Sequence, residues 1–258
     1  MTESAEALRA RKVQLEEAVL AGVKQHGADD VRVAELLGQL ASVIGRLGDV
    51  RSERKLLERV LVLKENHFGA DAAEMEETLI QVASSSGKAN DVLRESLLLD
   101  RAITIAEKHH GDKHPCIAVM LDQLAAAWLD LGDPWARVAL LQRALDIRKG
   151  AFTAAEDDRR HVVDVVQSQV DVAGSLLYVG QLSEAQTHVE DAFSLLAQTS
   201  TDSDDSKSRT RRRLADELDK LKANIGMVRA RRHVIVGGLA AAVVLMLAFI
   251  LAWLFPSF

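Results

Sequence analysis

The fold of this chain is decided by residues 114–149, which read HPCIAVMLDQLAAAWLDLGDPWARVALLQRALDIRK. Apolar residues in the first half recur at helical spacing, as in Leu121, Leu124 and Trp128. A Leu-Gly-Asp-Pro segment separates this run from a second apolar run. Pro115 and Pro134 each suit the first turn of a helix, because proline lacks the N–H that the first turn leaves unpaired. The stretch therefore predicts two helices joined by a tight turn.

The same pattern recurs along the chain with a period of 42 residues. Three columns carry it: aliphatic–alanine pairs, small residues, and glycines. Their members are Leu40/Ala41, Val82/Ala83, Leu124/Ala125 and Val172/Ala173; Ala18, Val60, Ala102, Ala144 and Ala192; and Gly27, Gly69 and Gly111. The last interval in the first two columns is 48, which indicates a six-residue expansion within 150–160. Small residues where helices approach, and glycines where helices end, predict a stack of helix pairs.

These residues resemble tetratricopeptide (TPR) repeats of the kinesin-light-chain type. The resemblance rests on residues 114–149, on 56–61 (LLERVL), and on 180–185 (GQLSEA) followed by Ala192. It covers roughly residues 13–198 and concerns the repeat type, not motor function. We therefore expect an all-α, TPR-like solenoid of antiparallel helix pairs over residues 1–198.

The resemblance implies a partner-binding surface, because the first helix of each TPR pair lines the concave face. Where kinesin-light-chain repeats carry paired asparagines, this chain has Gly-Gln, Ile-Gln and Asp-Gln, which leave a row of three glutamines. The candidate partner-binding residues are Gln39, Gln81 and Gln123, flanked by Glu35, Glu77, Arg46 and Lys88. The alternative is a solvated face on which polar residues drift.

Composition and charge exclude several classes. The 258 residues carry a net charge of -6, which divides into +7 over residues 207–233 and -13 over residues 1–206. An acidic body lacks the clustered cations that nucleic-acid phosphates require, so no nucleic-acid partner is expected. The single cysteine, Cys116, rules out an internal disulfide and a Cys-based zinc site.

The C-terminal segment predicts a membrane anchor. Residues 234–255 are apolar without interruption and, as a helix, span about 33 Å, enough for a bilayer core. Arg229, Arg231 and Arg232 flank only the near end, which places the N-terminal part in the cytosol. We expect a single-pass, tail-anchored protein. Its strongly hydrophobic tail with an uncharged end favours the endoplasmic reticulum or another secretory membrane over the mitochondrial outer membrane.

A linker and a basic helix are expected between the repeats and the anchor. Residues 199–209 are polar and of low complexity, which predicts a flexible linker. Residues 210–233 then carry a heptad seam of Leu214, Leu218, Leu221, Ile225 and Val228. This seam is either a dimerising neck through residues 214–228 or a cap that packs back on the last repeat. The two alternatives stay open.

Catalytic motifs are missing from the sequence. It contains no phosphate-binding glycine loop, no Gly-x-Ser-x-Gly and no His-Glu-x-x-His. His109, His110 and His114 gather near a predicted helix end, where histidine commonly interacts with terminal carbonyls. We expect neither an enzyme nor a cofactor or metal. The favoured function is a membrane-anchored adaptor that displays a protein-binding solenoid; the alternative is a permanent accessory subunit of a membrane complex.

Overall fold

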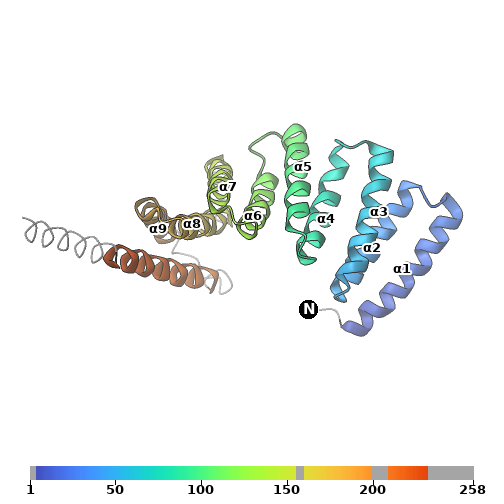
Figure 1. The fold of residues 1–258 in the computed structure, drawn as a ribbon, viewed down its shortest axis with the longest axis horizontal. Coiled ribbons are helices and arrows are strands. Elements are labelled where there is room, and N and C mark those ends of the chain that lie inside the picture. The colour runs from blue at the N-terminus through green and yellow to red at the C-terminus, as the bar shows by residue number, and fades with distance from the viewer. Residues whose placement is uncertain (1–3, 155–159, 199–208, 232–258) are drawn as a thin grey trace, which may run out of the picture. The chain divides into compact units, whose positions relative to one another are not determined.

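The computed structural model describes residues 4–154, 160–198 and 209–231, and in these ranges every regular element is a helix (Figure 1). The chain divides into two compact units, residues 1–156 and 157–258. The first unit contains α1 (Ala5–His26), α2 (Val31–Arg46), α3 (Val50–Phe68), the 3-10 helix η1 (Ala73–Met75), α4 (Glu76–Lys88), α5 (Val92–His110), α6 (Pro115–Asp130) and α7 (Pro134–Ala154). The second contains α8 (Arg160–Tyr178), α9 (Leu182–Gln198) and a helix over residues 209–231.

The first unit is a row of helix pairs, as predicted. Helices α2 and α3, α4 and α5, and α6 and α7 form pairs, and each helix from α1 to α7 packs against the next along the chain (Figure 1). Helix α1 precedes the first pair. Its Ala18 occupies the same repeat position as Val60, Ala102 and Ala144, which belong to the second helices α3, α5 and α7. The small residues lie where helices approach: Ala41, Ala83, Ala102 and Ala144 are fully buried. The prediction of an all-α repeat fold is confirmed.

Glycines follow α1 and the second helices of the first two pairs, as the spacing predicted. Gly27, Gly69 and Gly111 follow α1, α3 and α5, with φ of 93°, 92° and 87° and ψ near 155–159°. Glycine reaches this conformation without steric cost, because it has no Cβ. The other predicted signal is also confirmed, since Pro115 is the first residue of α6 and His114 is its N-cap.

The helix over residues 209–231 packs within the second unit. Leu214, Leu218 and Ile225 of the seam are buried, with 1%, 0% and 4% of their surface exposed. The Lys222 ammonium lies 5.7 Å from the centroid of the Phe193 ring of α9. The seam therefore faces its own chain, which favours the cap over the dimerising neck. A homodimer through residues 214–228 is not shown.

Several predicted segments lie outside the described residues. These are the apolar span 234–255, Arg232, and all of the linker 199–209 except Arg209. Arg229 and Arg231 are exposed at the end of the last described helix. Within the described ranges, none of the helices combines the length and the apolar character that crossing a membrane requires.

Candidate functional site

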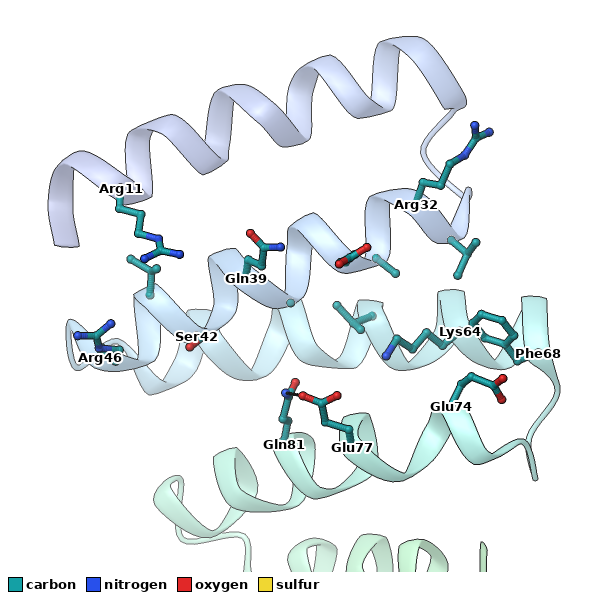
Figure 2. Close-up of a pocket in the computed structure, with 16 residues that line it drawn as sticks. Arg11, Arg32, Gln39, Ser42, Arg46, Lys64, Phe68, Glu74, Glu77 and Gln81 are labelled. Atoms are coloured by element: carbon teal, nitrogen blue, oxygen red, sulfur yellow. Dashed lines mark hydrogen bonds between the residues drawn. The ribbon is translucent and has the colours of Figure 1, made fainter. Parts of the chain in front are cut away.

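A groove opens on the exposed face of α2 (Figure 2). Its volume is about 630 Å³. Glu35, Gln39, Ser42 and Arg46 line it from α2, because residues at i, i+4, i+7 and i+11 share one side of a helix. Facing residues come from four other elements: Arg11 of α1, Lys64 and Phe68 of α3, Glu74 of η1, and Glu77 and Gln81 of α4.

A second pocket of about 380 Å³ adjoins this groove and carries it toward α6. The two share Gly38, Ser42, Arg46 and Gln81, and the second extends to Lys88 and Gln123. We call the two together the amide groove. All seven residues predicted for partner binding line it: Gln39, Gln81, Gln123, Glu35, Glu77, Arg46 and Lys88. Their positions agree with the expected face; their binding role stays a prediction.

The repeat imposes a charge order on the amide groove. Along α2 and α4 an acid comes first, a glutamine next, and a base last, as in Glu77, Gln81 and Lys88. This order suits the helix dipole, which favours acids near the N-terminus and bases near the C-terminus. Arg11 of α1 and Arg46 of α2 both line the groove, and Figure 2 shows them at the same end of it, the basic end. The opposite end is mixed, because Arg32 and Lys64 lie there with the acids (Figure 2).

The two cations at the mixed end bind neighbouring side chains. Arg32 binds the Asp30 carboxylate at 2.8 Å and 2.9 Å, and Lys64 donates to Thr78 Oγ1 at 2.8 Å. The Arg32 guanidinium holds the pKa of Asp30 well below its usual range. At the glutamine row, Gln81 Nε2 donates to Glu77 Oε1 at 3.0 Å, which leaves the amide oxygen available as an acceptor.

A buried acid that could not be predicted from the sequence lies at the basic end of the amide groove and pairs with a lysine there. Glu53 of α3 is only 7% exposed, and its carboxylate accepts from Lys88 Nζ at 3.0 Å and 3.4 Å. Gly45 leaves room for this carboxylate, because an added Cβ would lie 2.8 Å from Glu53 Oε2 and closer still to Oε1. The ion pair joins the second helix of one pair to the first helix of the next.

In the next repeat the equivalent of Glu53 is again an acid, but the equivalent of its lysine partner is not a base. Glu95 and Gly87 occupy the positions of Glu53 and Gly45, each 42 residues further on. The position of Lys88 is taken by an acid, Asp130. Burial, and then the Asp130 charge, raise the pKa of Glu95. A second negative charge therefore acts on Glu95 where the previous repeat has an ion pair.

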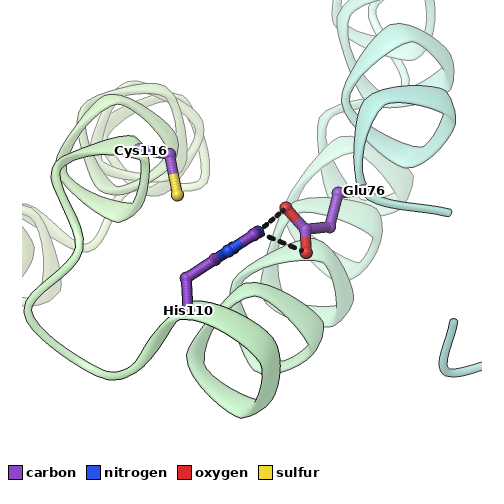
Figure 3. Close-up of side chains that lie close together, drawn as sticks. All are labelled: Glu76, His110 and Cys116. Atoms are coloured by element: carbon purple, nitrogen blue, oxygen red, sulfur yellow. Dashed lines mark hydrogen bonds and ion pairs between the residues drawn. The ribbon is translucent and has the colours of Figure 1, made fainter. Parts of the chain in front are cut away.

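The structure also gathers side chains that the sequence reading kept apart. Glu76, His110 and Cys116 place one donor atom each within 4.8 Å of one another (Figure 3). Burial, and then the Glu76 charge, raise the pKa of the Cys116 thiol. Glu76 lies 34 residues before His110, so only the packing of α4 against the end of α5 brings it near. The sequence places His110 and Cys116 six residues apart across a predicted helix end, but it carries no signal that brings Glu76 to them.

Comparison with solved structures supports a TPR-like repeat fold. The nearly identical TPR-like repeats of a kinesin light chain candidate from Podosopora anserina match with a TM-score of 0.64 at 21% identity, covering 76% of this chain and 90% of that one. The fold is TPR-like. BtubC (BKLC) from P. vanneervenii gives a TM-score of 0.65 at 15% identity over 77% and 76% of the two chains. MamA gives 0.53 at 12% identity over 78% and 100%. A scan of protein families and a search of curated proteins each gave no match.

Proposed function

We propose that this chain is a non-enzymatic protein-interaction module that binds a partner segment in the amide groove and is held at a membrane by residues 234–255. The observation that supports the proposal most is that Gln39, Gln81 and Gln123 line two adjoining pockets, with Gln81 shared between them. Repeat proteins of this architecture present extended binding surfaces because each repeat adds the same residues at the same place.

The glutamine row suits the backbone of an extended peptide. Each side-chain amide offers two donors and an acceptor, the complement of a peptide unit. Recognition of the backbone would give affinity without dictating sequence, and the charges at the ends of the groove would then fix direction. An acidic residue of the partner would lie toward Arg11 and Arg46 at the basic end of the amide groove.

The membrane part of the proposal rests on the sequence alone. Residues 234–255 have the length and apolarity of a bilayer span, and Arg229, Arg231 and Arg232 precede them. The repeats would then face the cytosol, with a secretory membrane favoured. To test this part, the full chain and a version that lacks residues 233–258 are expressed in the native cell, and the lysates are separated by membrane flotation. An unchanged membrane fraction would refute the anchor.

Site-directed photocrosslinking in the native cell tests the binding role. A photoreactive residue at Ser84, which lines the amide groove, is expected to crosslink a partner, while the same residue at exposed Thr104 of α5 is not. The triple variant Gln39→Ala, Gln81→Ala, Gln123→Ala should reduce the Ser84 crosslink at least about tenfold, since each amide hydrogen bond contributes about 0.5–1.5 kcal/mol.

A matched triple variant controls for composition and stability. Gln25→Ala, Asn66→Ala and Gln142→Ala change amides on α1, α3 and α7 that lie outside the groove, and they should leave the crosslink intact. Equal crosslinking at Ser84 and Thr104 would refute the groove as the binding site. Crosslinks only to integral membrane subunits, insensitive to the glutamine variant, would favour a permanent accessory subunit instead.

A further inference from the structure

Three helix ends meet at one point on the first unit, and each contributes a side chain that can bind a metal. Glu76 is the first residue of α4, His110 is the last residue of α5, and Cys116 is the second residue of α6. Their donor atoms lie within 4.8 Å of one another (Figure 3). The elements come from the second and third helix pairs, so the cluster straddles the junction between two repeats.

The contacts inside the cluster leave an acceptor in need of a cation. His110 Nε2 lies 3.1 Å from Glu76 Oε1 and 3.2 Å from Oε2. Glu76 Oε1 is buried, yet it makes no hydrogen bond of acceptable geometry with any described residue. A buried carboxylate oxygen without a full set of partners is costly, and a bound cation would remove that cost.

A fourth side chain stands beside the sulfur. His114 Nδ1 lies 2.8 Å from Cys116 Sγ, and its ring centroid lies 4.9 Å from that of His110. Because Nδ1 of His114 accepts the backbone N–H of Cys116 at the start of α6, it also accepts from the Cys116 thiol and holds the sulfur in place; a bound metal would take the place of the thiol proton, which would pass to solvent. His114 is therefore a positioning residue, and the three other side chains supply the ligand atoms.

The donor set selects the metal. Thiolate disfavours magnesium and calcium, which prefer oxygen, whereas a mixture of sulfur, nitrogen and oxygen suits zinc. The single Cys116 excludes a site built of several cysteines, but a mixed set needs only one. Zinc bonds of about 2.0–2.3 Å place tetrahedral ligands about 3.3–3.8 Å apart. The His110–Glu76 separations of 3.1 Å and 3.2 Å lie just below this range, and no pair of donor atoms in the cluster is more than 4.8 Å apart.

We propose that Glu76, His110 and Cys116 bind Zn²⁺, with water in the fourth position, and that the ion ties the start of α4 to the α5–α6 turn. The open position follows from the exposure of His110, whose side chain is 39% accessible. Zinc would displace the Cys116 proton and the His110–Glu76 contact. The ion would thereby convert a contact between two repeats into a coordinate crosslink.

Cobalt is the spectroscopic probe of this site. Full-length chain in detergent, titrated with Co²⁺, should show the thiolate charge-transfer band and the intense d–d bands of a tetrahedral site, and Zn²⁺ should abolish both. Cys116→Ser should lose the charge-transfer band, and His110→Ala and Glu76→Gln should each weaken Co²⁺ binding by about 10-fold or more. Zn²⁺ should raise the Tm of the parent chain and not that of Cys116→Ser.

The neighbouring histidine provides the matched control. His109 lies next to His110, but its Nε2 lies 3.0 Å from the carbonyl oxygen of Asp71, outside the cluster. His109→Ala should therefore keep the spectrum and the Tm rise. Weak, octahedral Co²⁺ bands without thiolate character would show binding at scattered histidines and overturn the proposal. A charge-transfer band at 1:1 stoichiometry that persists in both His110→Ala and Glu76→Gln would overturn the ligand assignment.

Discussion

Two glycines of α2 should respond in opposite directions to the same substitution. Gly38 and Gly45 both lie within the helix, where alanine is preferred over glycine by about 0.5–1 kcal/mol. A Cβ at Gly38 would meet no atom within 4 Å. A Cβ at Gly45 would lie 2.8 Å from Glu53 Oε2 and closer to the other carboxylate atoms. Gly38→Ala should therefore stabilise the fold, and Gly45→Ala should destabilise it.

The loss of stability in Gly45→Ala can be estimated from the interaction that the displaced Glu53 carboxylate makes. Glu53 must move by about 1 Å to reach ordinary contact distance, which breaks its pairing with Lys88. A hydrogen bond to a charged group contributes about 1.5–3 kcal/mol, and the lower half applies because Lys88 is about half exposed. After subtracting the helix gain, Gly45→Ala should lower the free energy of unfolding by about 1 kcal/mol. The two variants should differ by about 1.5–2 kcal/mol.

Urea unfolding of the full-length variants, followed by circular dichroism, measures the difference as a shift in the midpoint. A double-mutant cycle assigns it to the carboxylate. In a Glu53→Ala background, Gly45→Ala should stabilise the chain by about as much as Gly38→Ala does. Should Gly45→Ala raise the midpoint in the parent chain as much as Gly38→Ala, the carboxylate does not occupy this place and the reasoning is wrong.

Three further predictions concern neighbouring repeats. Asp130→Lys restores at Glu95 the ion pair that Lys88 forms with Glu53, and should raise stability by about 0.5–1 kcal/mol; a Tm gain that does not shrink in high salt would contradict this. The raised pKa of Glu95 means that its contribution is fully present at low pH and lost as pH rises through the folded-state pKa. Glu95→Gln should therefore raise the Tm at pH 7 more than at pH 4, and equal gains would argue against a buried charge. Gly69→Ala places a side chain at φ 92° and ψ 159° and should cost about 1–3 kcal/mol, and an unchanged urea midpoint would show that the helix end relaxes.

The helices and the amide groove could be predicted because their signals repeat. Pro115 and Gly69 mark helix ends, and the glutamine row recurs with the repeat. The period therefore predicts where on a helix each of these residues lies. The face of α2 on which Gln39 lies follows from helical spacing alone. Which residues bind a partner does not follow, because spacing is the same for a binding face and for a solvated one.

The features that the sequence reading missed depend on contacts between repeats. Glu53 reads as one more acid in a charged helix, and only packing shows that it is buried beside Lys88. Glu76 likewise gives no sign that it meets Cys116. The seam through Leu218 would show the same heptad spacing if it paired with another copy of the chain or packed on its own repeats. Burial of the seam within the second unit favours packing on its own repeats.

Because the helix over residues 209–231 packs within the second unit, the polar stretch before it does not set the distance between the repeats and a membrane. The polar stretch 199–208 starts directly after α9 and ends where this helix begins, so both of its ends belong to the same compact unit. Lengthening that stretch would add chain without moving this unit from a bilayer. In the anchored protein that we propose, only residues 232–233 separate the helix from the apolar span, so two residues, rather than the polar stretch 199–208, limit how far this helix can lie from the lipid.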